Sequence, residues 1–347
     1  MKKITFSFTA MLVVLLLSFT CVNAQKIGQL WGMSGQGDSA TGLIFMYNPL
    51  TGKDSVVRHL PGYNGPETPL YASLIQANDG NFYGTASNGG NNNGCVFVVT
   101  PSGTYILAKF NGFNGAFPSG GLIQGADGNL YGTATQGGTS SYGTIFKCTL
   151  GGTLTAIANF NNTNGGSPDG VLVQDKNGNL YGMTQTGGSG GNGTVFECTT
   201  AGTLKTLVNF SSGETPYGSL ILVKDSLYGM TLQGGSGSGT IFKCDTLGHL
   251  VTMVTFTNNE DPYGALLLAN DGNLYGMTSG GGSSGYGTIF KCTTTGMLTT
   301  LVNFANQEYP YGSLVQALDG NLYGMTSGGG TYNSGTVFKC TTSGTLT

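Results

Sequence analysis

The sequence predicts an all-β protein with a β-propeller fold, and three observations support this prediction. The chain has 347 residues, of which 62 are glycine, and this disfavours long helices because glycine costs about 1 kcal/mol in a helix interior. A Tyr-Gly pair recurs at intervals of 47 to 50 residues. Each interval contains four short runs of β-forming residues separated by turn signals. Four strands in each repeat are typical of the blades of a propeller.

The repeated tyrosine marks the second strand of each blade. A divergent copy, Trp31-Gly32, precedes the first tyrosine by 52 residues. The six tyrosines are Tyr83, Tyr131, Tyr181, Tyr228, Tyr275 and Tyr323. We therefore expect one domain over residues 25–347, with seven blades of four antiparallel strands. The strands of a blade are named a to d from the central axis outward.

The fifth repeat illustrates the elements of a blade. Residues 265–269 are an apolar run, strand a, which ends in a turn that contains Asp271-Gly272. Asp-Gly favours a tight hairpin because glycine tolerates the positive φ that such a turn needs. Strand b follows at residues 274–278, and a glycine-rich loop leads to strand c at 288–292 and strand d at 298–304. The strands are apolar without clean alternation, as expected where both faces of a sheet are buried.

The strand count leaves the predicted ring incomplete at its C-terminal end. Strands b and c occur seven times, but strand a occurs six times, and the last strand d is the stub Thr345-Leu346-Thr347. The first blade thus lacks strand a. We expect the reading frame to continue past Thr347 by about 20 residues, enough for the missing strands and one loop. Without them the ring would have an open seam with exposed strand edges.

Residues 1–24 predict a secretory signal peptide. Lys2 and Lys3 precede an apolar stretch from Met11 to Leu17, and Ala24 provides a small residue at the cleavage site. The stretch is short for a membrane-spanning helix, and the residues before Cys21 are a poor lipoprotein signal. We expect an exported protein, secreted or held at the cell surface, with no transmembrane segment in the mature chain.

The charge of the chain argues against a nucleic-acid partner. There are 13 basic and 16 acidic residues, whereas proteins that bind nucleic acid carry a basic surface. Removal of Lys2 and Lys3 with the leader leaves 11 basic residues against 16 acidic ones. The mature protein is therefore expected to be mildly acidic, and we expect a monomer.

Neither the cysteines nor the aspartates predict a metal site or another cofactor. Five cysteines share one position on strand c, where each lies on the same side as a phenylalanine two residues before it. Packing between blades explains this position better than disulfides, because equivalent positions on adjacent blades lie beyond bridging distance, and better than zinc, whose ligand spacing differs. The five are Cys148, Cys198, Cys244, Cys292 and Cys340. The Asp-Gly-Asn turns offer one carboxylate each, whereas calcium takes six to eight oxygens.

Catalytic motifs are scarce in the sequence. His59 and His249 lie in different repeats, and neither a Gly-x-Ser-x-Gly elbow nor a His-Glu-x-x-His motif occurs. A pair of carboxylates for glycoside hydrolysis remains open, because acids from any two blades could meet across one face of a propeller.

The connection from strand d to the next strand a is the best candidate for ligand binding. Three successive copies place a glutamate and a Pro-Tyr-Gly turn alike, on the face that also carries the b-to-c loops. The six candidate residues are Glu214, Glu260, Glu308, Tyr217, Tyr263 and Tyr311. Aromatic faces beside acidic hydrogen-bond acceptors suit sugars. In the alternative interpretation, each tyrosine only fills the gap between two blades.

The repeat also resembles a known family. Within residues 70–345, Asp-Gly-Asn-Leu-Tyr-Gly-Met-Thr is followed by Gly-Gly and then by Gly-Thr-Ile-Phe-Lys-Cys, and several positions recur in nearly every copy. This pattern resembles the GloVer tandem repeat of bacterial choice-of-anchor surface proteins. The first copy, around Trp31, departs most and lacks the tyrosine. The resemblance implies an exported bacterial protein, often joined to a variable C-terminal anchor or sorting signal, with no established activity.

Together these features predict an exported, non-catalytic binding or surface-interaction module. Its expected partner is a polysaccharide, with a surface protein as the other candidate. The first alternative is an exported glycan-active enzyme, a lyase or hydrolase, with acids on the loop face. The second is a structural spacer within a larger surface protein. Because a fold by itself does not determine function, these alternatives stay open at this point.

Overall fold

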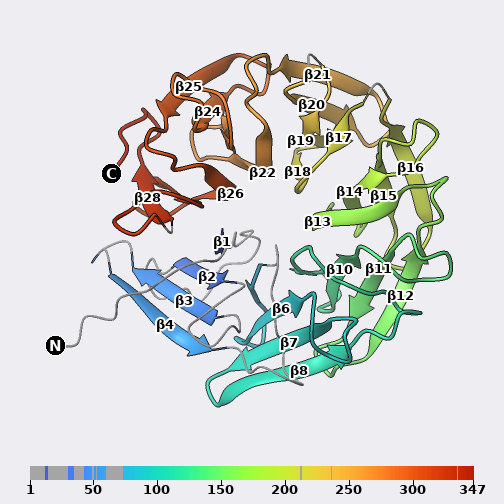
Figure 1. Ribbon diagram of the computed structural model, residues 1–347. Coiled ribbons are helices and arrows are strands. Elements are labelled where there is room, and N and C mark those ends of the chain that lie inside the picture. The colour runs from blue at the N-terminus through green and yellow to red at the C-terminus, as the bar shows by residue number, and fades with distance from the viewer. Residues whose placement is uncertain are drawn as a thin grey trace.

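The strands are arranged as a ring of small sheets around a central axis (Figure 1). A computed structural model of the chain describes residues 12–14, 30–34, 43–48, 51, 53–59, 73–211, 213–235, 237–333 and 335–347. Over these ranges the secondary structure consists of strands, and no helix that is long and apolar enough to cross a membrane occurs in them. The fold is a β-propeller, as the sequence predicts.

Residues 73–347 form six consecutive antiparallel sheets. The first contains β5 (Ile75–Gln76), β6 (Phe82–Ala86), β7 (Cys95–Thr100) and β8 (Gly103–Lys109). The second contains β9 (Ile123–Gln124), β10 (Leu130–Ala134), β11 (Thr144–Cys148) and β12 (Leu154–Asn159). The third contains β13 (Gly166–Gln174), β14 (Leu180–Thr186), β15 (Thr194–Cys198) and β16 (Leu204–Asn209).

The next sheets repeat this order with small differences. The fourth contains β17 (Thr215–Pro216), β18 (Ile221–Val223), β19 (Ser226–Gln233), β20 (Thr240–Asp245) and β21 (Leu250–Thr255), with β17 and β18 as two pieces of strand a. The fifth contains β22 (Pro262–Leu268), β23 (Leu274–Thr278), β24 (Thr288–Cys292) and β25 (Leu298–Asn303). The sixth contains β26 (Pro310–Gln316), β27 (Leu322–Thr326) and β28 (Thr336–Cys340).

A further sheet comes from the first 59 residues. It contains β1 (Leu12–Val14), β2 (Leu30–Ser34), β3 (Leu43–Asn48) and β4 (Lys53–His59). The sequence predicts no strand a here, but the structure differs, because β1 pairs with β2 and also contacts β26 and β27. The apolar Leu-Val-Val segment thus covers the free edge of β2. This segment lies within residues 1–24, for which the signal peptide remains a prediction.

The C-terminal residues lie where the strand count predicts a stub of strand d. Lys339 on β28 exchanges two backbone hydrogen bonds with Thr347, with N···O distances of 2.9 and 2.7 Å. Leu346 forms a bridge with Cys340. Leu346 and Thr347 therefore pair along the outer edge of β28.

Phenylalanine pairs join successive sheets. The residue after strand d of one sheet packs against the strand c phenylalanine of the next, with ring centroids 5.0 to 5.6 Å apart. The pairs are Phe110–Phe146, Phe160–Phe196, Phe210–Phe242, Phe256–Phe290 and Phe304–Phe338. Aromatic pairs of this kind add about 0.5–1.5 kcal/mol beyond the burial of their area. The core of the protein thus lies between the sheets.

The strand c cysteines lie in the same layer. Cys148, for example, is completely buried and belongs to one apolar cluster with Phe110 and Phe146. The six cysteines between residues 95 and 340 are all buried, free thiols. The predicted packing role of these residues is confirmed.

The Asp-Gly-Asn turns hold the repeated tyrosines. The Asp127 carboxylate accepts hydrogen bonds from the Asn129 backbone N–H at 3.1 Å and from the Tyr131 hydroxyl at 2.7 Å. Burial raises the pKa of Asp127, but the hydrogen bonds from Asn129 and Tyr131 outweigh it and lower the pKa to about 2. Asp79, Asp271 and Asp319 make the same pair of contacts. These carboxylates therefore stabilise turns, in agreement with the prediction that they are turn-formers.

Candidate functional site

The candidate site is built from the first residues of the strands closest to the axis. In five successive sheets, the residue after a recurring proline occupies the same place at the start of strand a. These residues are Ser119, Asp169, Tyr217, Tyr263 and Tyr311. They lie on the face of the ring that carries the d-to-a and b-to-c loops, and we call them the rim.

The three predicted tyrosines lie together on this rim. The ring of Tyr263 packs between those of Tyr217 and Tyr311, with centroid distances of 4.5 and 4.3 Å. The Tyr263 hydroxyl donates a hydrogen bond to that of Tyr217 at 2.7 Å. All three side chains are partly exposed. The tyrosines thus form one continuous aromatic surface, although the contacts between them also agree with the alternative that they fill gaps between blades.

The three predicted glutamates lie in the d-to-a loops, each three residues before a rim tyrosine. Glu308 accepts a hydrogen bond from the Ala305 backbone N–H at 3.0 Å, and Glu260 accepts one from the Asn258 backbone N–H. Glu214 packs against Gly234 of the neighbouring b-to-c loop. At least two of these carboxylates therefore have a structural partner in their own loop, which reduces their availability to a ligand.

Asp169 is a rim residue that the sequence does not single out. Its carboxylate accepts hydrogen bonds from the Ser119 hydroxyl at 2.7 Å, the Gln185 amide at 2.9 Å and the Gly170 N–H at 2.9 Å. Burial raises the pKa of Asp169, and these hydrogen bonds oppose the shift only in part. The rim thus combines an aromatic surface with a carboxyl group that has an elevated pKa.

Further aromatic side chains surround the rim on the loop face. Tyr309 lies edge-on to Tyr286 with centroids 5.4 Å apart. Phe113, in the d-to-a loop before Ser119, is 84% exposed, and Tyr332, in a b-to-c loop, is 65% exposed. These residues differ between copies of the repeat, so the repeat pattern gives no signal for them.

Glycines bring the inner strands of five successive sheets into close contact directly beneath the rim. Gly120, Gly170, Gly218 and Gly264 follow the rim residues, and a Cβ atom on any of them would overlap the backbone of the equivalent glycine in the next sheet. The last of these contacts is with Gly312. Gly170 and Gly218 also have φ values of +87° and +83°, which other residues rarely adopt. We call these five glycines the glycine ring; at this level the inner strands meet backbone to backbone.

A family model for the Gloeobacter/Verrucomicrobia repeat matches residues 20–223 and 209–347. The chain belongs to the Gloeobacter/Verrucomicrobia repeat family. This result confirms the resemblance noted from the sequence. A comparison with curated proteins gave no match.

Solved structures show which proteins share the fold of this Gloeobacter/Verrucomicrobia repeat protein. A streptogramin B lyase is 16% identical, with a TM-score of 0.64 over 87% of this chain and 88% of that chain. A virginiamycin B lyase from Staphylococcus aureus is 16% identical, with a TM-score of 0.63 over 87% and 89%. An oligogalacturonate lyase from Vibrio parahaemolyticus is 9% identical, with a TM-score of 0.61 over 95% and 90%. At such low identity, the likeness concerns the fold alone.

The rim of this repeat protein carries aromatic and polar side chains. Among the described residues, no group of three or more His, Cys, Asp or Glu side chains could hold a metal ion. His249 contacts Asp245 at 2.7 Å on an exposed turn between strands c and d, away from the rim. The side chain of His59 lies outside the described residues. The rim itself offers aromatic faces, hydroxyl groups and one carboxyl group.

Proposed function

We propose that this protein is an exported, non-catalytic binding module whose rim recognises carbohydrate. In this proposal β2, β3 and β4 belong to the seventh blade of the ring, and β1 is removed with the signal peptide. The predicted signal peptide supports export. The Gloeobacter/Verrucomicrobia repeat family, to which the chain belongs, is the one whose resemblance implied an exported protein. A surface polysaccharide is the proposed partner, with the protein secreted or at the cell surface.

One observation carries the proposal: the aromatic surface and a hydrogen-bonding group occupy equivalent positions on one rim. Tyr217, Tyr263 and Tyr311 present partly exposed rings in contact with one another. Asp169 and Ser119 occupy the equivalent positions on the two preceding sheets. A sugar ring has an apolar face and hydroxyl edges, and a tyrosine offers an apolar body and a polar tip. The rim can therefore contact both parts of a sugar.

The geometry also changes the roles proposed for the glutamates. Glu260 and Glu308 accept hydrogen bonds from the backbone of the loops that carry the tyrosines. We propose that they hold these loops in place, whereas Asp169 is the acidic group that faces the ligand. Substitution of Glu260 should then lower stability as well as affinity.

A glycan array tests the proposal. The protein would be expressed from its full sequence and compared with a Tyr217/Tyr263/Tyr311→Ala variant and with Asp169→Asn. The matched control is Tyr105→Ala, because Tyr105 is 50% exposed on β8, an outer strand. We expect the control to keep binding and both rim variants to lose at least about tenfold in affinity. Binding that survives the triple substitution in a folded protein would exclude the rim.

The export part of the proposal has its own measurement. Mass spectrometry of the protein recovered outside the cytoplasm should give a chain that begins at Gln25. A chain that retains Leu12–Val14 would instead keep β1 in its sheet and would contradict cleavage.

The raised pKa of Asp169 favours a second candidate, an exported lyase or hydrolase that acts on glycans. A carboxyl group with a raised pKa keeps its proton to a higher pH than usual, and in the protonated form it can act as a general acid. An oligogalacturonate lyase is among the proteins that share the fold. Turnover of a polysaccharide that Asp169→Asn abolishes would favour the enzyme, whereas binding without turnover favours the module. A purely structural spacer would show neither.

A further inference from the structure

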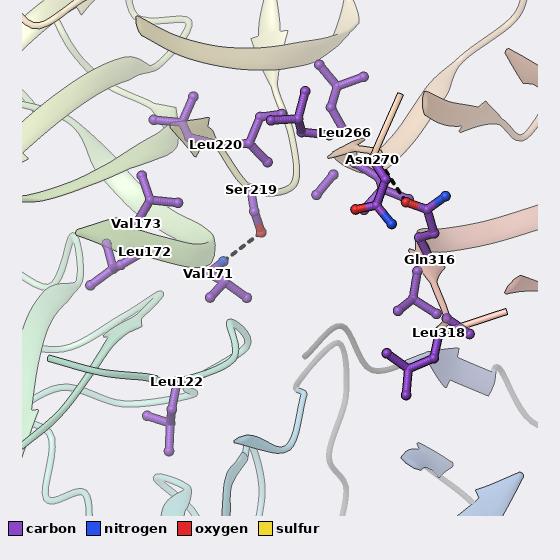
Figure 2. Close-up of a pocket in the computed structure, with 16 residues that line it drawn as sticks. Leu122, Val171, Leu172, Val173, Ser219, Leu220, Leu266, Asn270, Gln316 and Leu318 are labelled. Carbon is purple, nitrogen blue, oxygen red and sulfur yellow. Dashed lines mark hydrogen bonds between the residues drawn. The ribbon is translucent and has the colours of Figure 1, made fainter. Parts of the chain in front are cut away.

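A cavity lies along the central axis, among the innermost strands. Its volume is about 500 Å³, within the range of small-molecule sites. Residues from strand a of five successive sheets line it, from Leu122 in the second to Leu318 in the sixth (Figure 2). Leu220 and Leu266 come from the two sheets between Val173 and Gln316.

The cavity lies on the other side of the glycine ring from the rim. Ser219 and Ala265, which line it, directly follow Gly218 and Gly264, and the rim tyrosines directly precede these glycines. The lining continues along strand a to Asn270 and Leu318 in the a-to-b turns. Along each of these strands, the glycine ring, where neighbouring inner strands are in backbone contact, thus lies between the rim residue and the cavity lining.

The described residues of the lining are mostly aliphatic, and none of them carries a charged side chain. Thirteen of its 16 residues are Leu, Ile, Val or Ala, and the other three are Ser219, Asn270 and Gln316. Two polar groups serve the fold: the Ser219 hydroxyl accepts a hydrogen bond from the Val171 N–H, and Gln316 accepts one from the Asn270 N–H, both at 2.8 Å (Figure 2). A charged ligand would lose its hydration here without a compensating charge.

One repeat position of strand a explains why the apolar lining of the cavity extends to its opening, or mouth, on the side of the a-to-b turns. At this position of strand a, four sheets have a glutamine whose amide donates to the turn of its own sheet. These are Gln76, Gln124, Gln174 and Gln316. The fourth and fifth sheets have Leu222 and Leu268 instead. Leu268 lines the cavity and is 41% exposed.

A second position at which leucine replaces a polar residue lies in the sixth sheet. Leu318 is 77% exposed in its turn, at the place where other copies have Asn78 or Asn270. Leu268 and Leu318 therefore extend the aliphatic lining to the surface on the turn side. An exposed apolar border of this kind is the usual mark of a binding site rather than of a closed core.

We propose that this cavity is a second ligand site, which takes an uncharged aliphatic molecule with a medium-length alkyl chain. From Ala265 to Asn270 the lining follows strand a over about 16 Å, at 3.3 Å per residue. An elongated alkyl chain matches this length, and the lining residues that the structure describes include no aromatic ring for stacking. The polar head of the ligand lies at the mouth, beside Asn270.

The test uses 1-decanol as the probe and two substitutions that the repeat itself suggests. Leu268→Gln and Leu318→Asn introduce residues that sister sheets carry at the same positions, so the double variant is expected to fold. Saturation-transfer NMR and a thermal shift would measure binding by the protein expressed from its full sequence. Because the double variant replaces apolar surface at the mouth of the cavity by polar side chains, we expect it to bind 1-decanol at least about tenfold more weakly.

The control is Leu222→Gln, which makes the same change at the same repeat position but outside the cavity lining. This variant and the Tyr217/Tyr263/Tyr311→Ala variant should bind 1-decanol within about twofold of the parent protein. The proposal is overturned if the parent protein does not bind 1-decanol up to its solubility limit. It is also overturned if the double variant binds as tightly as the parent, or if the tyrosine variant loses binding.

Discussion

Gly276 on β23 lies directly beneath the ring of Phe290, its partner on β24, so that a Cβ atom on Gly276 would overlap the ring. The same relationship occurs in all six sheets of residues 73–347, between the glycine of Tyr-Gly and the strand c phenylalanine. The pairs are Gly84–Phe97, Gly132–Phe146, Gly182–Phe196, Gly229–Phe242, Gly276–Phe290 and Gly324–Phe338. The Tyr-Gly repeat is therefore a packing requirement of the neighbouring strand.

Gly276→Ala should destabilise the protein by about 1–3 kcal/mol, the usual cost of an overfilled core. Chemical denaturation would measure the change in the free energy of unfolding. The control is Gly151→Ala, because Gly151 is exposed and its Cβ would lie 3.7 Å from the nearest atom. The double variant Gly276→Ala/Phe290→Leu should lose less free energy of unfolding than the sum of the losses in the two single variants, because the smaller leucine leaves room for the added methyl group. Losses that simply add would contradict the proposed contact.

The strand c thiols should be unreactive in the folded protein. Burial raises the pKa to about 12 for Cys148, Cys198 and Cys244, and to about 11 for Cys292 and Cys340. The thiolate is the reactive form, so a disulfide reagent at pH 8 should label these residues only after unfolding. In guanidinium chloride at least six thiols should react, and rapid labelling without denaturant would contradict the packing.

The protein should lose stability steeply between about pH 4 and pH 2. Hydrogen bonds outweigh burial and lower the pKa of Asp127 to about 2, and they also lower the pKa of Asp79, Asp175, Asp271 and Asp319. An unfolded aspartate has a pKa near 3.9. A lowered pKa stabilises the folded state above the unfolded value, and this stabilisation disappears as the pH falls through the folded value. Equal melting temperatures at pH 5 and pH 2.5 would exclude this linkage.

Asp169 should have the opposite effect on the pH dependence. Burial raises its pKa, so the charged form destabilises the folded state and stability falls as the pH rises from about 4 through the folded value. Asp169→Asn should therefore melt at the same or a higher temperature than the parent protein at pH 7. This advantage should shrink at pH 4. A lower melting temperature at pH 7 would show that the carboxylate is held in its charged form.

Much of the fold could be predicted from repeat spacing, because each copy in residues 73–347 forms strands b and c at the same positions. The free edge of β2 shows the limit of this approach. Strand a of that sheet comes from Leu12–Val14, residues that have no repeat signature and were assigned to a signal peptide. Pairing to a free edge depends on backbone contacts, which the repeat pattern does not encode.

The site could be predicted only in part, for a similar reason. The sequence pointed to Tyr217, Tyr263 and Tyr311 because three copies share Pro-Tyr-Gly. Asp169 was missed because its copy of the loop keeps the proline and the glycine but has no tyrosine between them. The aromatic signal that marks the other three copies is therefore absent at this position. The contacts among the tyrosines depend on the spacing between sheets, which no single repeat contains.

The phenylalanine pairs between sheets bear on how such a protein arises. Each repeat supplies the residue that ends strand d, such as Phe160, and also the strand c phenylalanine that receives the one before it, such as Phe146. Each of these copies thus carries both phenylalanine positions of the contact between sheets. A gene that gains or loses one whole unit still encodes matching neighbours, and the circumference of the ring changes while each junction is inherited intact.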